Sequence, residues 1–260
     1  MGRRRQRHFN PATAGCAAVF DGRFGISSAY VNPPGNYVTT WEGRSKSLHS
    51  AAGVDGVSPV DRKKLINGQG ACQSGPNIDP FYIGQNPFSS GPASGINLQT
   101  QNCSVFICAH FEYNQNYTEY ARILGVVPDC SAYYGIRQPS YPTPGPAYVA
   151  SFFGDAVLTW NDLNENSPTV SADAPFAACF SNSGTACTPI ANNTAQSNKT
   201  VTAVQCNAAY LFGTVISGVY MTQEFRGTVG MIAIATAKLS TPVERRILQM
   251  MGRVWRIHTL

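Results

Sequence analysis

The stretch FRGTVGMIAIATAKLSTPVERRILQMMGRVW, residues 225–255, contains the clearest change from strand to helix in the chain. Its apolar and β-branched residues up to Leu239 predict a strand. The four residues TPVE (241–244) then supply an N-cap threonine, a proline at the first helical position and the glutamate of a capping box. They predict a helix over 241–252 that stops at Gly252. The apolar face of this helix is expected to contain Val243, Ile247, Leu248 and Met251.

Further strands are predicted upstream of this stretch. In CSVFICAHFEY (103–113) apolar residues occupy both sets of alternating positions, which indicates a strand buried on both faces and central in a sheet. YARILGVV (120–127) predicts another strand, and YVASFFGDAVLTW (148–160) predicts two that break at Gly154 into a hairpin. The polar run SNSGTACTPIANNTAQSNKT (181–200) has few apolar residues, so we expect an exposed excursion there.

The composition narrows the fold class. Only 13% of the 260 residues are charged and 43% are hydrophobic, with 24 glycines and 17 prolines. The 28 aromatic residues argue against disorder, and the scarcity of Glu, Lys and Arg argues against a coiled coil. No apolar run reaches the roughly 18 residues of a membrane span. We therefore expect an all-β, antiparallel β-sandwich with long loops, one short C-terminal helix and an extended N-terminal arm.

Much of the formal net charge of +5 lies at the start of the chain. We expect residues 1–15 to form a basic arm and residues 16–260 a single domain that is almost neutral. Such an arm can bind nucleic acid, an anionic surface or an acidic groove on a neighbouring subunit, and the alternative is a solvated, frayed tail. The arm lacks the apolar stretch of a secretory signal, so synthesis in a cytoplasm is expected. Its positive charges come from Arg3, Arg4, Arg5 and Arg7.

The eight cysteines allow 105 disulfide pairings and include no C-x-x-C motif for zinc. Cys103 and Cys108 should face opposite sides of one strand, so they are not expected to pair with each other. Cys179 and Cys187 flank turn residues and are predicted to close a hairpin loop with a disulfide. Small buried thiols are the alternative.

The stretch after residue 224 also resembles the closing segment of concanavalin A-like (laminin G-like) jelly-roll domains. These domains occur in lectins, in glucanases and in bacterial and phage structural proteins. They end on an apolar strand of pattern G-x-I/V-G-x-I-x-I, followed by L-S/T, a short helix and a terminal Trp. A Glu often follows the second glycine in that family, whereas this chain has Met231. The matching residues are Gly227, Val229, Gly230, Ile232, Ile234, Leu239, Ser240, Glu244 and Trp255.

Two upstream segments are similar to the same family. VTTWEGRSKSLHSAA (38–52) resembles its W-x-D-x-S-G-x-x-x-x-A segment, with Gly43 and Lys46 in place of the usual Asp and Gly. The strand predicted over 103–113 resembles the family's central T-x-F-V-V-x-x strand. The resemblance spans residues 37–255 and implies an antiparallel jelly-roll β-sandwich. The matching positions in the first segment are Trp41, Ser45, His49 and Ala51.

Catalysis is not expected from this sequence. Laminarinase-type enzymes that share the fold carry E-x-D-x-E on one strand for retaining hydrolysis, and none of the 14 acidic residues makes that spacing. Cys108 and His110, two residues apart on one strand, lie too far from each other for a nucleophile–base pair. No cofactor or clustered metal motif is present, although calcium on the loop residues Asp155, Asp162 and Asn164 stays open.

These features favour a non-enzymatic, virion-type structural protein: a capsid decoration, head fibre or tail component. It would assemble in the virion with copies of itself and neighbouring subunits and contact host glycans, with nucleic acid bound only through the basic arm. The alternative is a free carbohydrate-binding or adhesion module outside the cell, and a glycoside hydrolase ranks third. The predicted glycan contacts are Tyr133, Tyr134, Tyr141 and Trp160, with core or loop packing as their alternative role.

Overall fold

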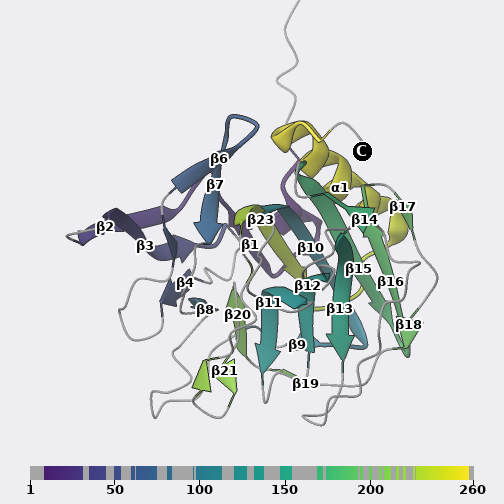
Figure 1. The fold of residues 1–260 in the computed structure, drawn as a ribbon. Coiled ribbons are helices and arrows are strands. Elements are labelled where there is room, and N and C mark those ends of the chain that lie inside the picture. The colour runs from purple at the N-terminus through teal and green to yellow at the C-terminus, as the bar shows by residue number, and fades with distance from the viewer. Residues whose placement is uncertain are drawn as a thin grey trace, which may run out of the picture.

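The structure of the protein is a computed structural model. It describes residues 9–31, 35–44, 50–53, 60–61, 63–74, 81–83, 96, 98–112, 120–127, 132–137, 147–153, 169–171, 174–192, 194–195, 199–200, 205–206, 208–211, 215–216, 219–220, 225 and 227–257. Two large antiparallel sheets and one α-helix account for most of these residues (Figure 1). The expected all-β, antiparallel architecture with a C-terminal helix is confirmed.

Sheet A has nine strands in the order β17–β16–β15–β10–β23–β7–β6, with β1 also paired to β23 and β18 to β16. The strands are β1 (Ala18–Asp21), β6 (Lys63–Ile66), β7 (Gln69–Ser74), β10 (Asn102–Phe111), β15 (Phe176–Ser183), β16 (Ala186–Ala191), β17 (Thr194–Ala195), β18 (Lys199–Thr200) and β23 (Gly227–Ala235).

Sheet B has ten strands in the order β14–β13–β12–β11–β20–β8–β4–β3–β2, with β5 paired to β3. The strands are β2 (Ile26–Val31), β3 (Gly35–Glu42), β4 (Ser50–Gly53), β5 (Val60–Asp61), β8 (Phe81–Ile83), β11 (Tyr120–Val127), β12 (Ala132–Arg137), β13 (Ala147–Phe153), β14 (Thr169–Val170) and β20 (Ala208–Leu211). Two short pairs complete the described strands: β9 (Leu98–Gln99) with β19 (Gln205–Cys206), and β21 (Val215–Ile216) with β22 (Val219–Tyr220).

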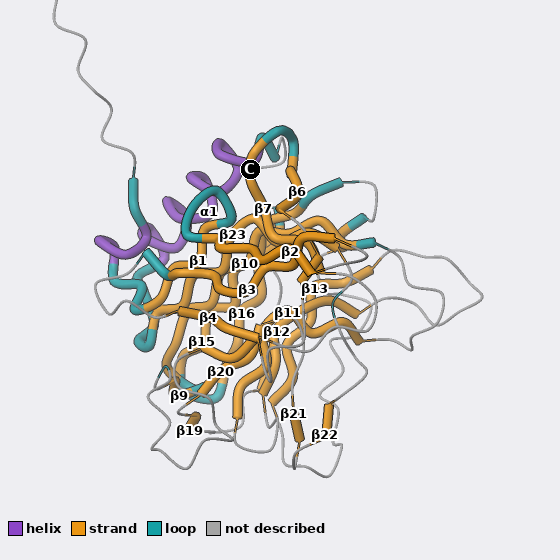
Figure 2. Tube along the Cα trace, turned by 90° about the vertical axis from the view of Figure 1, so that its left-hand side faces the viewer, coloured by secondary structure: helices purple, strands orange, loops and turns teal. Residues whose placement is uncertain are grey.

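The elements form three layers. Sheet A lies between sheet B on one face and helix α1 (Thr241–Trp255) on the other (Figure 2). One apolar core fills the space between the two sheets, and a second core lies between sheet A and α1. The short 3₁₀ helix η1 (Pro11–Ala14) packs against the second core.

Strand β10 is central, as the sequence predicts, and pairs with β15 on one side and β23 on the other. Val105 and Ile107 belong to the core between the sheets, whereas Phe106 and Cys108 belong to the core under α1. Successive side chains of a strand point to opposite faces. The double apolar pattern of this strand therefore reflects a sheet covered on both sides.

The predicted helix is confirmed, but both of its ends differ from the prediction. Ser240, and not Thr241, is the N-cap residue, and its side chain makes no cap hydrogen bond. The helix continues past Gly252 to Trp255 and ends where Arg256 adopts the left-handed conformation, with φ of 53°. Burial of Trp255 in the second core explains the extra turn, because the apolar face continues beyond the glycine.

The polar run at 181–200 is not an exposed excursion, and that prediction is wrong for its described part. β15 extends to Ser183, and β16 returns antiparallel to it with alternating buried side chains. Cys187 and Ala191 point into the core between the sheets. Because these side chains are small, the segment lines the core between the sheets although it contains few large apolar residues.

Other expectations on the strands are confirmed in part. β11 covers the predicted strand at 120–127. β13 covers the first half of the predicted hairpin at 148–160, and the second half lies outside the described residues. Within the described residues, no helix is long and apolar enough to span a membrane.

Candidate functional site

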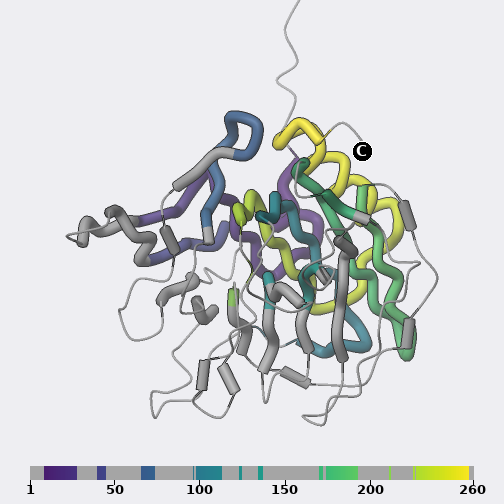
Figure 3. The backbone as a smooth tube through the Cα atoms, in the orientation of Figure 1, coloured from purple at the N-terminus to yellow at the C-terminus, as the bar shows by residue number. Residues whose placement is uncertain are grey.

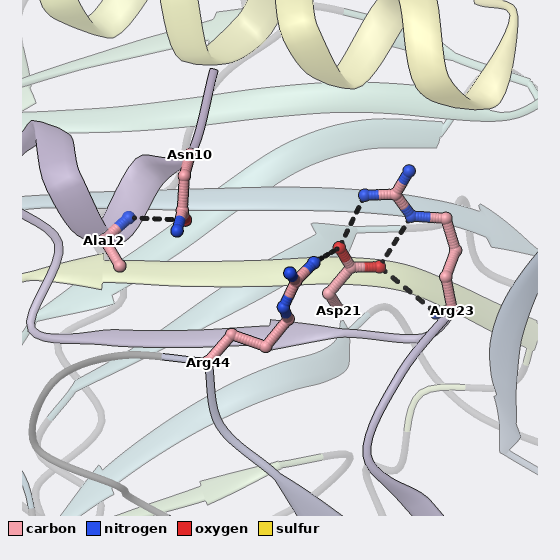
Figure 4. Close-up of polar contacts among 5 residues, drawn as sticks. All are labelled: Asn10, Ala12, Asp21, Arg23 and Arg44. Carbon is pink, nitrogen blue, oxygen red and sulfur yellow. Dashed lines mark hydrogen bonds and ion pairs between the residues drawn. The ribbon is translucent and has the colours of Figure 1, made fainter. Parts of the chain in front are cut away.

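At one edge of the protein a buried carboxylate binds two arginine side chains that extend to the surface. Asp21, the last residue of β1, is 1% exposed. Its carboxylate accepts hydrogen bonds from Arg23 Nη2 at 2.7 Å and Nε at 2.9 Å, and from the Arg23 backbone N–H at 3.1 Å. Arg44 Nη1 approaches the same carboxylate at 3.4 Å (Figure 4). A buried charge requires this kind of compensation.

Glycine and backbone contacts fix the turn that follows β1. A side chain at Gly22 would meet Ala71 Cα of β7 at 2.6 Å, so only glycine fits. The Gly22 N–H donates to Gly230 O of β23 at 2.8 Å, and the Arg44 N–H donates to Val19 O at 2.7 Å. The turn after β1 and the chain after β3 are therefore both attached to sheet A, which brings the two arginines together.

Phe24 is the exposed aromatic residue of this cluster, with 46% of its surface accessible. The guanidinium carbon of Arg44 lies 4.1 Å from its ring centroid, and that of Arg23 lies 5.0 Å away. The Arg23 guanidinium also lies 5.3 Å from the Trp255 ring. We call Arg23, Phe24 and Arg44, held on Asp21, the arginine–phenylalanine cluster. It combines an exposed aromatic ring with two guanidinium groups held on one carboxylate, so Asp21, Arg23 and Arg44 together carry a charge of +1, which favours an anionic ligand.

Of the predicted glycan contacts, Tyr134 lies in the core between the sheets. Its side chain has no exposed surface, so the prediction that it touches a glycan is wrong. The ring packs 5.1 Å from that of Phe180, and its hydroxyl lies 3.3 Å from Asn182 Nδ2. Tyr141, Trp160 and the side chain of Tyr133 lie outside the described residues.

Tyr134 belongs to a buried polar cluster that links the two sheets. Asn182 Nδ2 donates to Thr100 O at 2.8 Å, and Cys103 Sγ lies 3.5 Å from the Tyr134 hydroxyl. Burial raises the pKa of the Cys103 thiol to about 11, while hydrogen bonds from Tyr134 and Asn182 act in the opposite direction. Sequence reasoning missed this cluster because Asn182 stands in the run interpreted as exposed.

The predicted disulfide between Cys179 and Cys187 is wrong, because neither residue forms a disulfide. In the β15–β16 register Cys179 lies opposite Ile190 and Cys187 lies opposite Asn182. Cys179 points into the core under α1, and Cys187 points into the core between the sheets. Burial raises the pKa of the Cys179 thiol well above its ordinary value.

The predicted basic arm is described only from residue 9 onward. Phe9 and η1 pack against the core under α1, and Asn10 Oδ1 caps η1 by accepting the Ala12 N–H at 3.1 Å (Figure 4). The arginines Arg3, Arg4, Arg5 and Arg7 lie outside the described residues. The candidate calcium ligands Asp155, Asp162 and Asn164 also lie outside them, and the described residues contain no group of three metal-binding side chains.

The glycines of the closing strand have steric roles. Gly227 has φ of 140°, and a side chain there would collide with His110 O of β10. Gly230 is the extra residue of a bulge, since Cys108 pairs with Met231 and Ala109 with Val229. These contacts explain why glycines recur in the motif of the final strand.

No family model matches the chain, and no curated protein matches it. Solved structures do match. Trypanosoma rangeli sialidase in complex with sialic acid has 10% identity and a TM-score of 0.56 over 92% of this chain and 33% of the sialidase. A mutant of a GH54 α-L-arabinofuranosidase, soaked with 4-nitrophenyl α-L-arabinofuranoside, has 12% identity and a TM-score of 0.59 over 92% of this chain and 63% of that enzyme.

The chain thus spans about a third of the sialidase and less than two thirds of the arabinofuranosidase. At these identities the likeness concerns the fold. The protein has a concanavalin A-like jelly-roll β-sandwich, which confirms the class that the closing segment resembles.

Proposed function

We propose that the protein is a non-enzymatic carbohydrate-binding module and that the arginine–phenylalanine cluster receives an acidic sugar. One observation carries the proposal: on a concanavalin A-like sandwich, an exposed aromatic ring lies beside two guanidinium groups that share one carboxylate. An aromatic face can stack on the apolar face of a sugar ring. Arginine donors match the geometry of a carboxylate.

Arg44 has further N–H donors besides the one that binds Asp21, and these can bind a ligand. The described bond from Arg44 to Asp21 uses Nη1 at 3.4 Å, and a guanidinium has five donors. The Arg44 side chain is 44% exposed, so these donors reach solvent. The structural neighbours support the sugar class, since the sialidase is in complex with sialic acid and the arabinofuranosidase was soaked with an arabinofuranoside.

The proposal of a non-enzymatic role rests on the acidic residues. Glycoside hydrolysis uses two carboxylates that face each other across the bond to be cleaved. Asp21 is already bound by two arginines, and Glu244 accepts a hydrogen bond from Ser104 in the interior. Neither of these two buried carboxylates is open to a sugar.

The test is a glycan array that contains neutral and acidic sugars, followed by calorimetry on the best ligand. Phe24→Ala and Arg44→Gln should each weaken binding about tenfold, in line with a cation–π or charge-assisted contact. The control is Arg253→Gln, which removes an exposed arginine from α1. A blank array, or unchanged affinity in both cluster variants, would falsify the assignment.

A second candidate is the virion-type structural role, with the protein located in the virion among copies of itself and neighbouring subunits. It is favoured by the charge distribution, since eight of the 19 Lys and Arg residues lie in the first eight or last sixteen positions. Deleting residues 2–8 tests the arm without touching η1, which packs on the fold. Weaker attachment to a large particle is the expected result, and unchanged co-sedimentation would exclude this role for the arm.

A further inference from the structure

Helix α1 presents a stripe of arginines to solvent. At 3.6 residues per turn, positions 245, 246, 249 and 253 fall within an arc of about 100°. The residues at these positions are exposed, and Arg256 follows them at the C-cap. The opposite side of the helix is buried against sheet A through Ile247, Leu248, Met251 and Trp255. We call Arg245, Arg246, Arg253 and Arg256 the arginine stripe.

The charge of the stripe is uncompensated within the described residues. The acidic residue of α1, Glu244, points into the protein and binds Ser104 Oγ at 2.7 Å. The ion pairs found in the described part of the chain are those of Asp21 with Arg23 and Arg44. Arginines in the first turns of a helix also oppose its dipole. The dipole therefore gives no reason for Arg245 and Arg246, whereas it favours Arg253 in the last turn.

The first described residues of the chain lie on the same side of the molecule. The Arg246 guanidinium carbon lies 5.1 Å from the Phe9 ring centroid, and residues 9–15 pack beside α1 (Figure 3). Phe9 and η1 therefore lie beside the arginine stripe.

We propose that this cationic face binds the phosphate backbone of nucleic acid without sequence preference. Arginine pairs bidentately with phosphate. Arg245 and Arg253 are about 12 Å apart along the helix, so they can reach separate phosphates. The interaction does not depend on the proposed sugar site.

Two other anionic partners fit the face less well. A protein interface has an apolar centre with aromatic residues, whereas the polar stripe offers arginines and Gln249. A helix that inserts into a membrane interface needs its apolar face exposed, and that of α1 is buried in the second core. The phosphate backbone requires neither feature.

The experiment measures anisotropy of labelled DNA duplexes of two unrelated sequences between about 50 and 200 mM salt. The double variant Arg245→Gln/Arg253→Gln should lower the slope of log K against log salt by about 2, equally for both sequences. Arg245→Lys/Arg253→Lys should retain most of the slope. Arg122→Gln/Arg137→Gln, with equal loss of charge on β11 and β12 of sheet B, is the matched control.

Deletion of residues 2–8 should lower the slope further, by up to about 4. Melting temperatures of the stripe variants should match that of the unaltered protein, because Arg245 and Arg253 are exposed. Three results would overturn the proposal: no DNA binding at low salt, an equal loss in the sheet B control, or tighter binding to polyglutamate or to anionic vesicles than to DNA. The Phe24→Ala variant should bind DNA normally, which separates this face from the sugar site.

Discussion

At the scale of single residues, the contact between Gly230 and Trp255 shows how the closing motif works. A Cβ at Gly230 would lie 2.5 Å from Nε1 and 2.6 Å from Cε2 of Trp255. The indole of the last helical residue thus rests directly on the backbone of β23. Trp255 Nε1 has no acceptor among the described residues, so packing and not a hydrogen bond holds the ring. Glycine and tryptophan therefore form one steric unit although they stand 25 positions apart.

Gly230→Ala should destabilise the protein by about 1–3 kcal/mol, because the added methyl overlaps the indole. Trp255→Phe alone should also destabilise it, through lost packing. The double variant Gly230→Ala/Trp255→Phe should be more stable than the sum of the two losses, since the smaller ring leaves room for the methyl. Urea unfolding of the four proteins measures the coupling, and strict additivity would contradict the steric account.

At the scale of elements, α1 is joined to sheet A by a buried hydrogen-bond chain. Ser104 Oγ of β10 donates to Glu244 Oε1 at 2.7 Å and accepts the Leu239 N–H at 2.9 Å. Glu244 is therefore turned inward to the sheet and does not form the predicted capping box. The carboxylate fixes the first turn of the helix against the central strand.

Ser104→Ala should lower the free energy of unfolding by about 1–3 kcal/mol, because the buried carboxylate loses its donor. Ser240→Ala is the matched control, since the N-cap side chain makes no cap bond, and it should change stability by less than about 0.5 kcal/mol. Glu244→Gln keeps an acceptor without a charge, so it should be milder than Ser104→Ala. Equal effects of Ser104→Ala and Ser240→Ala in chemical denaturation would refute the inward role of Glu244.

At the scale of the whole molecule, three layers enclose two separate cores, and the six thiols that the structure describes are buried and form no disulfide. Burial raises the pKa of Cys16 to about 12 and of Cys103 to about 11, from an ordinary value near 9. In the unfolded chain these thiols ionise near their ordinary pKa. The folded state keeps these thiols protonated to a higher pH than the unfolded chain does. The free energy of unfolding therefore has its full value below pH 9 and falls as the pH rises toward 11–12.

Urea unfolding between pH 8 and about 11 should show this loss, at up to about 1.4 kcal/mol per thiol and pH unit. Cys16→Ala removes one such group, so its stability should fall less steeply with pH than that of the unaltered protein. At about pH 8, below the ordinary thiol pKa, iodoacetamide should leave the described thiols unmodified in the native protein and label them after denaturation. Parallel pH curves for the two proteins, or native labelling at Cys103, would count against buried thiols.

The sequence predicted the elements whose signal is local. The closing strand, the central strand at 103–113 and the helix after Ser240 each carry a periodic apolar pattern, and all three are present. Element ends and faces were less well predicted. The helix passes Gly252 because Trp255 is buried, and β16 was missed because Cys187 and Ala191 fill an inner face with small side chains.

The candidate sites depended even more on contacts between distant residues. Tyr134 and Cys187 share a hydrophobic core with residues of both sheets, which no spacing in the sequence reveals. Arg23 and Arg44 meet on Asp21 although they stand 21 positions apart in the chain. The sequence offered one signal for this cluster, a short R-F-G turn after a strand. Such turns are too common to identify a binding site.

By itself, the sequence determined an antiparallel β-sandwich closed by a helix, because alternation, turn residues and helix periodicity are local properties of the chain. It also determined that positive charge is concentrated at the two ends. Only the tertiary structure decided which side chains meet. It buried Tyr134, separated Cys179 from Cys187 on opposite faces of one sheet, and brought residues 9–15 to the side of α1. These outcomes depend on which faces the sheets and the helix cover, and that is a property of packing between segments far apart in the chain.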